Sequence, residues 1–327
     1  MTTVSLLIAT HNRAALLART LDHLSALRIP SDAAVDLLVV GNACTDSTAE
    51  VVASAGRQLA FPVRYINEPQ LGVAFARNRC LREGAGEILM FLDDDVWPEP
   101  HWLEAMLAVF ATAPADIVGG RVDLWWEAVS RPKWFNASLE DWLGTRDHGN
   151  TVRELTDPND ALSANLGLRR GVLEKIGGFT TGLGRTGNRL LSCEERDFLA
   201  RALAAGCRMY YAPGAAVKHW VAPHRVTPKY LRELGYGVGQ SFVYMKTRFG
   251  PVQICRTVAG HGLMLLRYTA NQTVAAVRGR QDVAAQFRIL QMMCLGAISG
   301  SVNRVLGRSP VHGSTATGAK PSSLAEC

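Results

Sequence analysis

Short apolar runs alternate with amphipathic stretches over the first 125 residues. The runs have strand length, are rich in Val, Ile and Leu, and cover residues 4–9, 35–40, 63–66, 88–92 and 116–124. Continuous apolar runs of this kind are typical of strands that are buried on both faces. Helical periodicity fills the intervals between them. The pattern predicts an α/β fold with a mostly parallel sheet and helices on both faces.

The second half of the pattern is less regular. Residues 125–159 hold four of the seven tryptophans among charges and prolines, which predicts an insertion or a long loop. Two short apolar pieces, 208–211 and 216–219, are predicted as edge strands. Thr227 precedes Pro228, and a capping residue followed by proline in the first turn predicts a helix start there.

Charge divides the chain unevenly. Residues 251–308 carry seven arginines against one acid, Asp282, so this segment alone accounts for the net charge of +6. Its longest charge-free run, 289–303, is fifteen residues, short of the roughly 18 that indicate a spanning helix. We predict amphipathic helices that lie on an anionic membrane. The alternative is a basic helical bundle that packs on the domain or forms a homodimer.

These patterns suggest three regions. We predict a catalytic domain over 1–225, a basic amphipathic helical segment over 226–308 and a disordered tail over 309–327.

Composition narrows the class of protein. With 48% hydrophobic and 20% charged residues among 327, the chain is globular. Its seven cysteines are scattered without a C-x-x-C pair, which argues against disulfides and zinc and for a reducing, cytoplasmic setting. An apolar strand follows the first residues directly, so we expect no signal peptide. The absence of G-x-G-x-x-G after the first strand argues against a dinucleotide oxidoreductase. The basic helices have few aromatic residues, which argues against nucleic-acid binding.

The most informative stretch is the apolar run 88–92, which ends in Asp93, Asp94 and Asp95. Three adjacent carboxylates repel one another, so something positive must offset them. A divalent cation is the economical choice, because hard cations are held by carboxylates together with substrate phosphates. Ligands of open α/β sheets bind beyond the carboxyl ends of the strands, where these acids fall. The alternative is a solvated acidic loop that caps a helix near Trp97.

Six motifs occur in an order that resembles the family 2 glycosyltransferases, which have the GT-A nucleotide-sugar-binding fold. They are Thr10-His11-Asn12-Arg13, the loop from Asn42 to Asp46, Gly72 to Asn78, the aspartate triplet, Glu194-Glu195 and Val217-Lys218-His219. The resemblance covers roughly residues 1–245. It implies an inverting transfer of sugar from a nucleotide diphosphate sugar to a glycan or lipid-linked acceptor.

The resemblance also implies a metal site. Asp95 would bind Mn²⁺ or Mg²⁺ between the donor phosphates, and His219 would complete the coordination. Asp93 and Asp94 would hold the ribose, although Asp93 also fits the first position of the D-x-D motif. Such a metal would stabilise the charge on the departing diphosphate.

Glu195 is the candidate general base. A carboxylate at a helix N-terminus is stabilised in its charged form, and here it would take the proton of the acceptor hydroxyl. The family more often has Glu-Asp at this pair, so this chain departs by one methylene, and Glu194 remains a rival.

Thr10, Asn12, Asn42 and Arg77 are the remaining candidates for binding the nucleotide sugar. The family often has an acid at the position of Gly41 that contacts the base, and Asn42, whose amide both donates and accepts, is the candidate replacement. Uridine, guanosine and deoxythymidine donors therefore all remain open.

Acceptor contacts of the family fall at Asn165, Gly120 and the tryptophan-rich segment. Aromatic faces suit a pyranose, but the tryptophans fit slightly better as core residues of a subdomain.

Two further functions remain possible from the sequence. A sugar nucleotidyltransferase would need a glycine- and lysine/arginine-rich loop after the first strand, which Thr10-His11-Asn12-Arg13 does not provide. The second is a non-catalytic nucleotide-sugar-binding scaffold anchored by the basic helices. For the enzyme, we expect a peripheral location on the cytoplasmic face of the plasma membrane.

Overall fold

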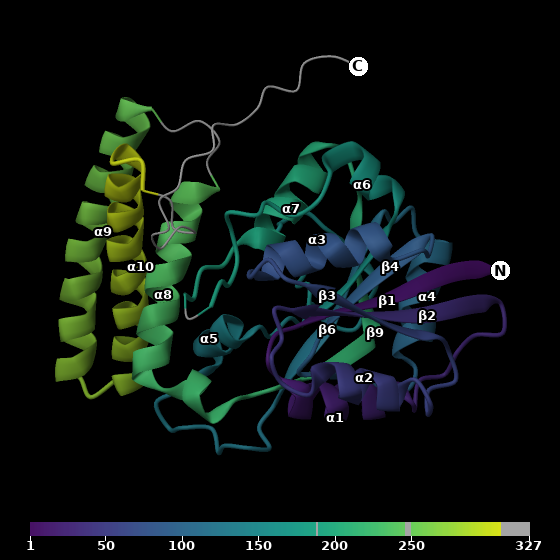
Figure 1. Ribbon diagram of the computed structural model, residues 1–327. Coiled ribbons are helices and arrows are strands. Elements are labelled where there is room, and N and C mark those ends of the chain that lie inside the picture. The colour runs from purple at the N-terminus through teal and green to yellow at the C-terminus, as the bar shows by residue number, and fades with distance from the viewer. Residues whose placement is uncertain (188, 246–249, 309–327) are drawn as a thin grey trace, which may run out of the picture.

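The computed structural model describes residues 1–187, 189–245 and 250–308 (Figure 1). The predicted tail over 309–327 lies outside these ranges. The strands are β1 (Thr2–Thr10), β2 (Ala33–Asn42), β3 (Val63–Glu68), β4 (Ile88–Asp93), β5 (Val96–Pro98), β6 (Ile117–Trp125), β7 (Arg153–Leu155), β8 (Asn165–Arg169) and β9 (Met209–Trp220). They form one sheet in the order β3-β2-β1-β4-β8-β6-β9-β5, with β7 paired to β9.

The first four strands of this order are parallel, as predicted. β1 lies between β2 and β4, and its Ala9 is in register with Asp93. β6 and β9 are also parallel, whereas β8 is antiparallel to both of its neighbours. Because the carboxyl ends of β1, β2 and β4 meet at one edge, the loops that follow these strands converge there.

Helices cover both faces of the sheet (Figure 1). The helices are α1 (Ala14–Leu24), α2 (Thr48–Ala55), α3 (Val73–Glu83), α4 (Trp102–Thr112), α6 (Gly171–Ile176) and α7 (Glu194–Ala204). Leu6 and Ile8 of β1 point into a core with α1, α2 and α4, while Leu7 points into a second core with α3, α6 and α7. The α/β fold with two covered faces is therefore confirmed.

The prediction of two edge strands at 208–211 and 216–219 was wrong. They are parts of the continuous strand β9, which has β6 on one side and β5 and β7 on the other. Pro213 and Gly214 look like a break in the sequence. In the sheet they fall where the register between β6 and β9 shifts, so the extra residues form a bulge instead of ending the strand.

The tryptophan-rich segment contains two short helices, α5 (Ala137–Glu140) and η1 (Asp141–Leu143). Trp126, Trp134 and Trp142 pack against a third apolar cluster, to which Leu231 and Leu234 of α8 (Pro228–Tyr244) also belong. Their placement favours the core role for most of this aromatic surface.

Three long helices follow the sheet. The short helix η2 (Pro223–Val226) leads into α8, whose predicted cap is confirmed, because the Thr227 side chain accepts a hydrogen bond from the N–H of Tyr230. α9 (Pro251–Val277) and α10 (Gln281–Val305) confirm that the basic segment is helical. The predicted domain boundary after residue 225 falls within η2 and stays a prediction.

α10 lies between α8 and α9 (Figure 1). A side chain at Gly239 of α8 would collide with the backbone of Met293, and one at Gly296 would collide with that of Tyr236. Glycine at these positions allows the two helix backbones to approach closely.

By length and composition, α10 is apolar enough to cross a membrane, which the count of charge-free residues missed. The difference arises because a spanning window tolerates a charged residue. This is weak evidence for a span, since core helices of soluble proteins pass the same test, and α10 packs on both α8 and α9.

The Asp46 carboxylate accepts hydrogen bonds from the first residues of two helices at the edge of the sheet. One carboxylate oxygen accepts the N–H of Ala14 at the start of α1 (2.9 Å), and the other accepts the N–H (3.2 Å) and hydroxyl (2.5 Å) of Thr48 at the start of α2. Burial opposes the charge, but these hydrogen bonds together outweigh it and lower the pKa of Asp46.

We expect Asp46→Ala to reduce the free energy of unfolding at pH 7 by about 1 kcal/mol, the usual effect of losing a helix cap. Because the folded pKa lies below the unfolded value, this stabilisation is present above the unfolded pKa of about 3.9 and is lost as the pH falls through the folded pKa. Urea unfolding of both proteins from pH 7 to pH 3 measures the difference. Exposed Asp32→Ala is the control, and a difference that stays constant over this range contradicts the prediction.

Candidate active site

A cavity of about 800 Å³ opens at the carboxyl ends of β1, β2 and β4. Its lining includes the ends of these strands, the start of α7 and one side of α8. The predicted site residues Thr10, Asn42, Arg77, Asp93, Asp94, Asp95, Glu194, Glu195 and His219 all line it. The fold thus gathers residues that are more than 200 positions apart in sequence.

Asp94 is held on all sides by the protein. Thr10 donates its hydroxyl proton to one carboxylate oxygen (2.6 Å), and Arg13 donates to the other (2.5 Å). Thr20 also donates to the backbone carbonyl of Asp94 (2.8 Å). Burial raises the pKa of Asp94 and the charge of Asp95 adds to this, while Arg13 opposes the shift. These bonds fix the turn that follows β4.

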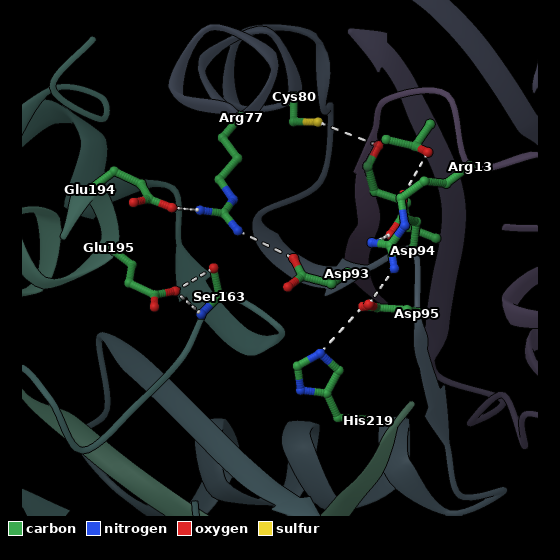
Figure 2. A network of polar contacts seen from close by, with 12 residues as sticks. Arg13, Arg77, Cys80, Asp93, Asp94, Asp95, Ser163, Glu194, Glu195 and His219 are labelled. Carbon is green, nitrogen blue, oxygen red and sulfur yellow. Dashed lines mark hydrogen bonds and ion pairs between the residues drawn. The ribbon is translucent and has the colours of Figure 1, made fainter. Parts of the chain in front are cut away.

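Arg13 supplies the positive charge that three adjacent acids require. Its guanidinium reaches Asp94 with one nitrogen and Asp95 with the other (2.6 Å), as Figure 2 shows. Burial opposes the charge on Asp95, but Arg13 and His219 outweigh it and hold the pKa of Asp95 well below its usual range. From the sequence, a divalent cation was the expected source of this positive charge. The signal for Arg13 was the basic residue at the end of the first motif.

His219 extends from β9 toward Asp95. Its Nε2 lies 3.4 Å from Asp95 Oδ1 and 3.3 Å from Nη1 of Arg225. Its Nδ1 is buried and has no hydrogen-bond partner among the described residues. Nδ1 lies beside Gly144, so it is Nε2, together with the ionised Asp95 carboxylate, that could hold a divalent cation. Within the described ranges no cluster of three such ligands forms, which suits Mg²⁺ and related ions that take one or two protein ligands plus substrate phosphates.

Arg77 lies between two acids (Figure 2). It donates to Glu194 (2.6 Å) with one nitrogen and to Asp93 (3.2 Å) with another. The side chains of Arg77 and Glu194 are only 7% and 10% exposed, whereas that of Asp93 is 34% exposed. Burial raises the pKa of Glu194, and Arg77 opposes this shift. Glu194 is thus an ion-pair partner, whereas Asp93 keeps an accessible oxygen.

Removing Arg77 should leave a buried carboxylate unpaired. We expect Arg77→Met to reduce the free energy of unfolding by about 3 to 5 kcal/mol, and Arg77→Met with Glu194→Met to recover much of that loss. Urea denaturation of each variant measures it. The matched control is Arg79→Met, which removes a half-buried pair with Glu83, four residues along α3, and should cost about 0.3 to 0.5 kcal/mol. A double variant no more stable than Arg77→Met contradicts the prediction.

Glu195 is oriented by Ser163, which precedes β8. Its Oε2 accepts both the backbone N–H (2.8 Å) and the hydroxyl (2.5 Å) of Ser163. Within the described ranges Oε1 has no hydrogen-bond partner, and in the view of Figure 2 Ser163 lies between the Glu195 carboxylate and Asp93. Two hydrogen bonds to one oxygen fix the carboxylate and leave the other oxygen available. Nothing in the local sequence marks Ser163, because its contact with Glu195 joins residues 32 positions apart.

The loops after β1 and β2 are tied to each other. Asn12 adopts a left-handed conformation (φ 50°) and accepts the N–H of Thr45 (2.7 Å). The Asn42 amide donates to the carbonyl of Gln70 (2.7 Å) and accepts the N–H of Gly72 (2.8 Å). The side chains of Asn12 and Asn42 therefore use these hydrogen bonds to hold the loops together.

Gly41 lies under the ring of Tyr65. A side chain at residue 41 would collide with the Tyr65 hydroxyl, so the phenol occupies the space where the family often has an acid.

Two predicted acceptor contacts do not reach the cavity. Asn165 is fully buried in the sheet, where its amide donates to the carbonyls of Arg121 and Ala215 and accepts from the indole of Trp102. A side chain at Gly120 would collide with this amide and with the Ala215 carbonyl. Both residues therefore serve packing: the small glycine makes room for an amide that bridges strands. Trp142 does line the cavity.

One wall of the cavity is apolar. Leu234, Val238 and Phe242 form a stripe along α8. The Ser241 hydroxyl of the same helix accepts the N–H of Ser192 (3.0 Å), in the loop that leads to Glu194 and Glu195. α8 therefore both lines the cavity and supports this loop. The spacing of these three residues is that of one helix side, but nothing in the sequence places that side at the cavity.

An open α/β sheet with acids at the end of β4, facing a carboxylate at the start of α7, defines a GT-A glycosyltransferase. The family model described as glycosyl transferase family 2 matches residues 5–177. The chain belongs to glycosyl transferase family 2 and is a glycosyltransferase.

Relatives and solved structures agree with this assignment. The chain is 28% identical over 232 residues to the succinoglycan biosynthesis protein ExoM of Rhizobium meliloti (strain 1021), covering 69% of each chain. It is 27% identical over 165 residues to the glucosyl-dolichyl phosphate glucuronosyltransferase of Haloferax volcanii, covering 50% of this chain and about half (52%) of that protein. Mannosyltransferase PcManGT from Pyrobaculum calidifontis, in complex with GDP-Man and Mn²⁺, shares the fold (TM-score 0.60, 17% identity, 93% of this chain and 87% of that one).

Proposed function

We propose that this enzyme transfers a sugar from a nucleotide diphosphate sugar to an acceptor hydroxyl with inversion at the anomeric carbon. The observation that carries the proposal is that Asp93, Asp95, His219 and Glu195 line one cavity, with Glu195 fixed by Ser163. A neighbour in fold holds GDP-Man and Mn²⁺, which supports a nucleotide-sugar donor and a divalent metal for this chain as well.

Asp95 and His219 are the proposed metal ligands. A divalent cation held there would offset the charge of the leaving diphosphate. Arg13 keeps Asp95 ionised, and Arg225 places a second positive charge beside His219. The accessible oxygen of Asp93 is proposed to face the donor. Thr10, Asn42, Arg77 and Asp94 act as positioning residues through the contacts that they make within the protein. Asn12, whose side chain accepts the N–H of Thr45, is proposed to shape the loop beside the nucleotide.

Glu195 is the proposed general base. Its carboxylate takes the proton of the acceptor hydroxyl while that oxygen forms a bond to the anomeric carbon and the bond to the diphosphate oxygen breaks. One displacement with one base inverts the configuration, through a transition state with oxocarbenium character. Glu194 is the weaker candidate, because its carboxylate is engaged by Arg77.

We propose that the acceptor is a glycan or a lipid-linked glycan. The enzyme would bind it while attached peripherally to the cytoplasmic face of the plasma membrane. The apolar stripe of Leu234, Val238 and Phe242 on the cavity wall supports an acceptor with an apolar part. One relative is named for a dolichyl phosphate substrate and another for succinoglycan biosynthesis.

The test is binding of a panel of uridine, guanosine and deoxythymidine diphosphate sugars with and without Mn²⁺. Calorimetry should show one donor class that binds, with higher affinity when Mn²⁺ is present. The panel is needed because Gly41 offers no side chain to the base. If no activated sugar binds under either condition, the proposed function is wrong.

A further inference from the structure

α9 presents an apolar face on the outside of the molecule. It packs on α10, and α10 packs on α8, so α9 is the outermost helix of this layer (Figure 1). Five large apolar side chains along α9 are between 49% and 83% exposed: Val252, Leu263, Leu266, Val274 and Val277. Their spacings of 11, 3, 8 and 3 residues keep them on one side of the helix, and exposed apolar residues gathered in this way mark an interaction surface.

A line of arginines accompanies this apolar row. Arg256, Arg267 and Arg278 are exposed and spaced by eleven residues, which is about three helical turns, so they lie on one side of the helix. Residues 251–281 contain four arginines and no acid. Within the described ranges none of these three arginines pairs with a carboxylate. We call the five apolar residues and three arginines together the outer face of α9.

We propose that the outer face of α9 binds flat on an anionic lipid bilayer. In this orientation the apolar side chains enter the boundary between headgroups and acyl chains, and the arginines reach lipid phosphates. A spanning orientation of α9 is disfavoured, because an arginine every three turns would place one inside the hydrocarbon. This inference names the surface used in the proposed peripheral attachment.

A second copy of the chain is a poorer occupant of the same face. Two such faces packed together would bring six guanidinium groups into one interface without acids on either side. Like charges brought together in an interface are strongly unfavourable. An anionic bilayer supplies phosphates for the same groups, so charge complementarity selects the bilayer.

The experiment measures binding of the full chain to vesicles of phosphatidylcholine with and without phosphatidylglycerol. Each arginine near an anionic surface contributes about fivefold to binding, so Arg256→Gln, Arg267→Gln and Arg278→Gln together should weaken binding about 100-fold. The matched control replaces three exposed arginines of the catalytic domain, Arg28→Gln, Arg57→Gln and Arg153→Gln, with the same change in net charge. This control should bind nearly as well as the unaltered chain.

The apolar half of the face has its own variant. Leu263→Ser with Leu266→Ser should weaken binding at least tenfold without unfolding the protein, since both side chains are about 70% exposed. Thermal unfolding checks that the fold is retained.

Three outcomes would overturn the proposal: equal binding to neutral and anionic vesicles, equal losses in the two arginine triples, or a dimer that the leucine variant converts to a monomer. Because the readout is lipid binding, it can fail while transfer activity stands, and the reverse also holds.

Discussion

Glu195→Gln is expected to lower the rate of sugar transfer by about 10² to 10⁴-fold, the usual contribution of a positioned general base. Glutamine keeps an oxygen that can accept the N–H and hydroxyl of Ser163, but its amide cannot take a proton from the acceptor. Donor binding should therefore be unchanged. Single-turnover transfer and calorimetric donor binding on the same preparation measure the two effects separately.

Two further variants sharpen this result. Glu195→Asp introduces the residue that the family more often has at this position. It should retain part of the activity, because it keeps a carboxylate, and lose the rest, because its side chain is one methylene shorter. Glu194→Gln should act mainly on stability through Arg77. Full turnover in Glu195→Gln together with complete loss in Glu194→Gln would move the base to Glu194. Retention of anomeric configuration in the product, read by NMR, would reject the single-displacement mechanism.

Asp95→Asn and His219→Ala are expected to weaken Mn²⁺ binding in the presence of donor by at least about 100-fold, since loss of an outer-shell partner alone costs 10–100-fold. Transfer should fall by about 10² to 10³-fold, because the charge of the leaving group is no longer stabilised. Electron paramagnetic resonance of Mn²⁺ reads metal binding directly, independently of activity.

The controls for the metal prediction test whether the loss of any carboxylate weakens Mn²⁺ binding or only the loss of a proposed ligand. Asp22→Asn removes an exposed carboxylate on α1 and should leave Mn²⁺ binding unchanged. Glu195→Gln should also keep the metal, because its carboxylate is bound to Ser163 rather than to the proposed ligands. Unaltered Mn²⁺ affinity in both Asp95→Asn and His219→Ala would remove these residues from the site. Transfer that persists after chelation would reject metal dependence.

Contacts with Arg13 and Arg77 give the three aspartates of the site different roles. The three aspartates that follow β4 have different environments: Asp93 contacts Arg77, Asp94 is bonded by Thr10 and Arg13, and Asp95 lies between Arg13 and His219. Adjacent residues of one type are thereby separated into an accessible acid, a positioning acid and an ionised candidate ligand. The sequence shows three identical residues and does not indicate which of them has which role.

The local pattern alone predicted most of the catalytic domain. Strands that are buried on both faces appear in the sequence as continuous apolar runs. In helices with one buried side, the apolar residues recur with a period of about 3.6 residues. The positions of β1 to β4, the cap at Thr227 and the two long helices at the end followed from these local rules. The order of six motifs was sufficient to indicate the family and nine of the residues that line the cavity.

Contacts across the fold decided the rest. Whether Asn165 meets an acceptor or bridges strands depends on Trp102, Arg121 and Ala215, which are 44 to 63 residues away. The bond from Ser163 to Glu195 and the α8 wall depend equally on distant segments.

Periodicity reports only which side of an element is buried, and it does not report what the element is buried against. The sequence by itself therefore determined the α/β architecture, the family and the candidate acids. Only the tertiary structure, by pairing each polar group with a partner remote in the chain, decided which acid is engaged, which is free and which amide is structural.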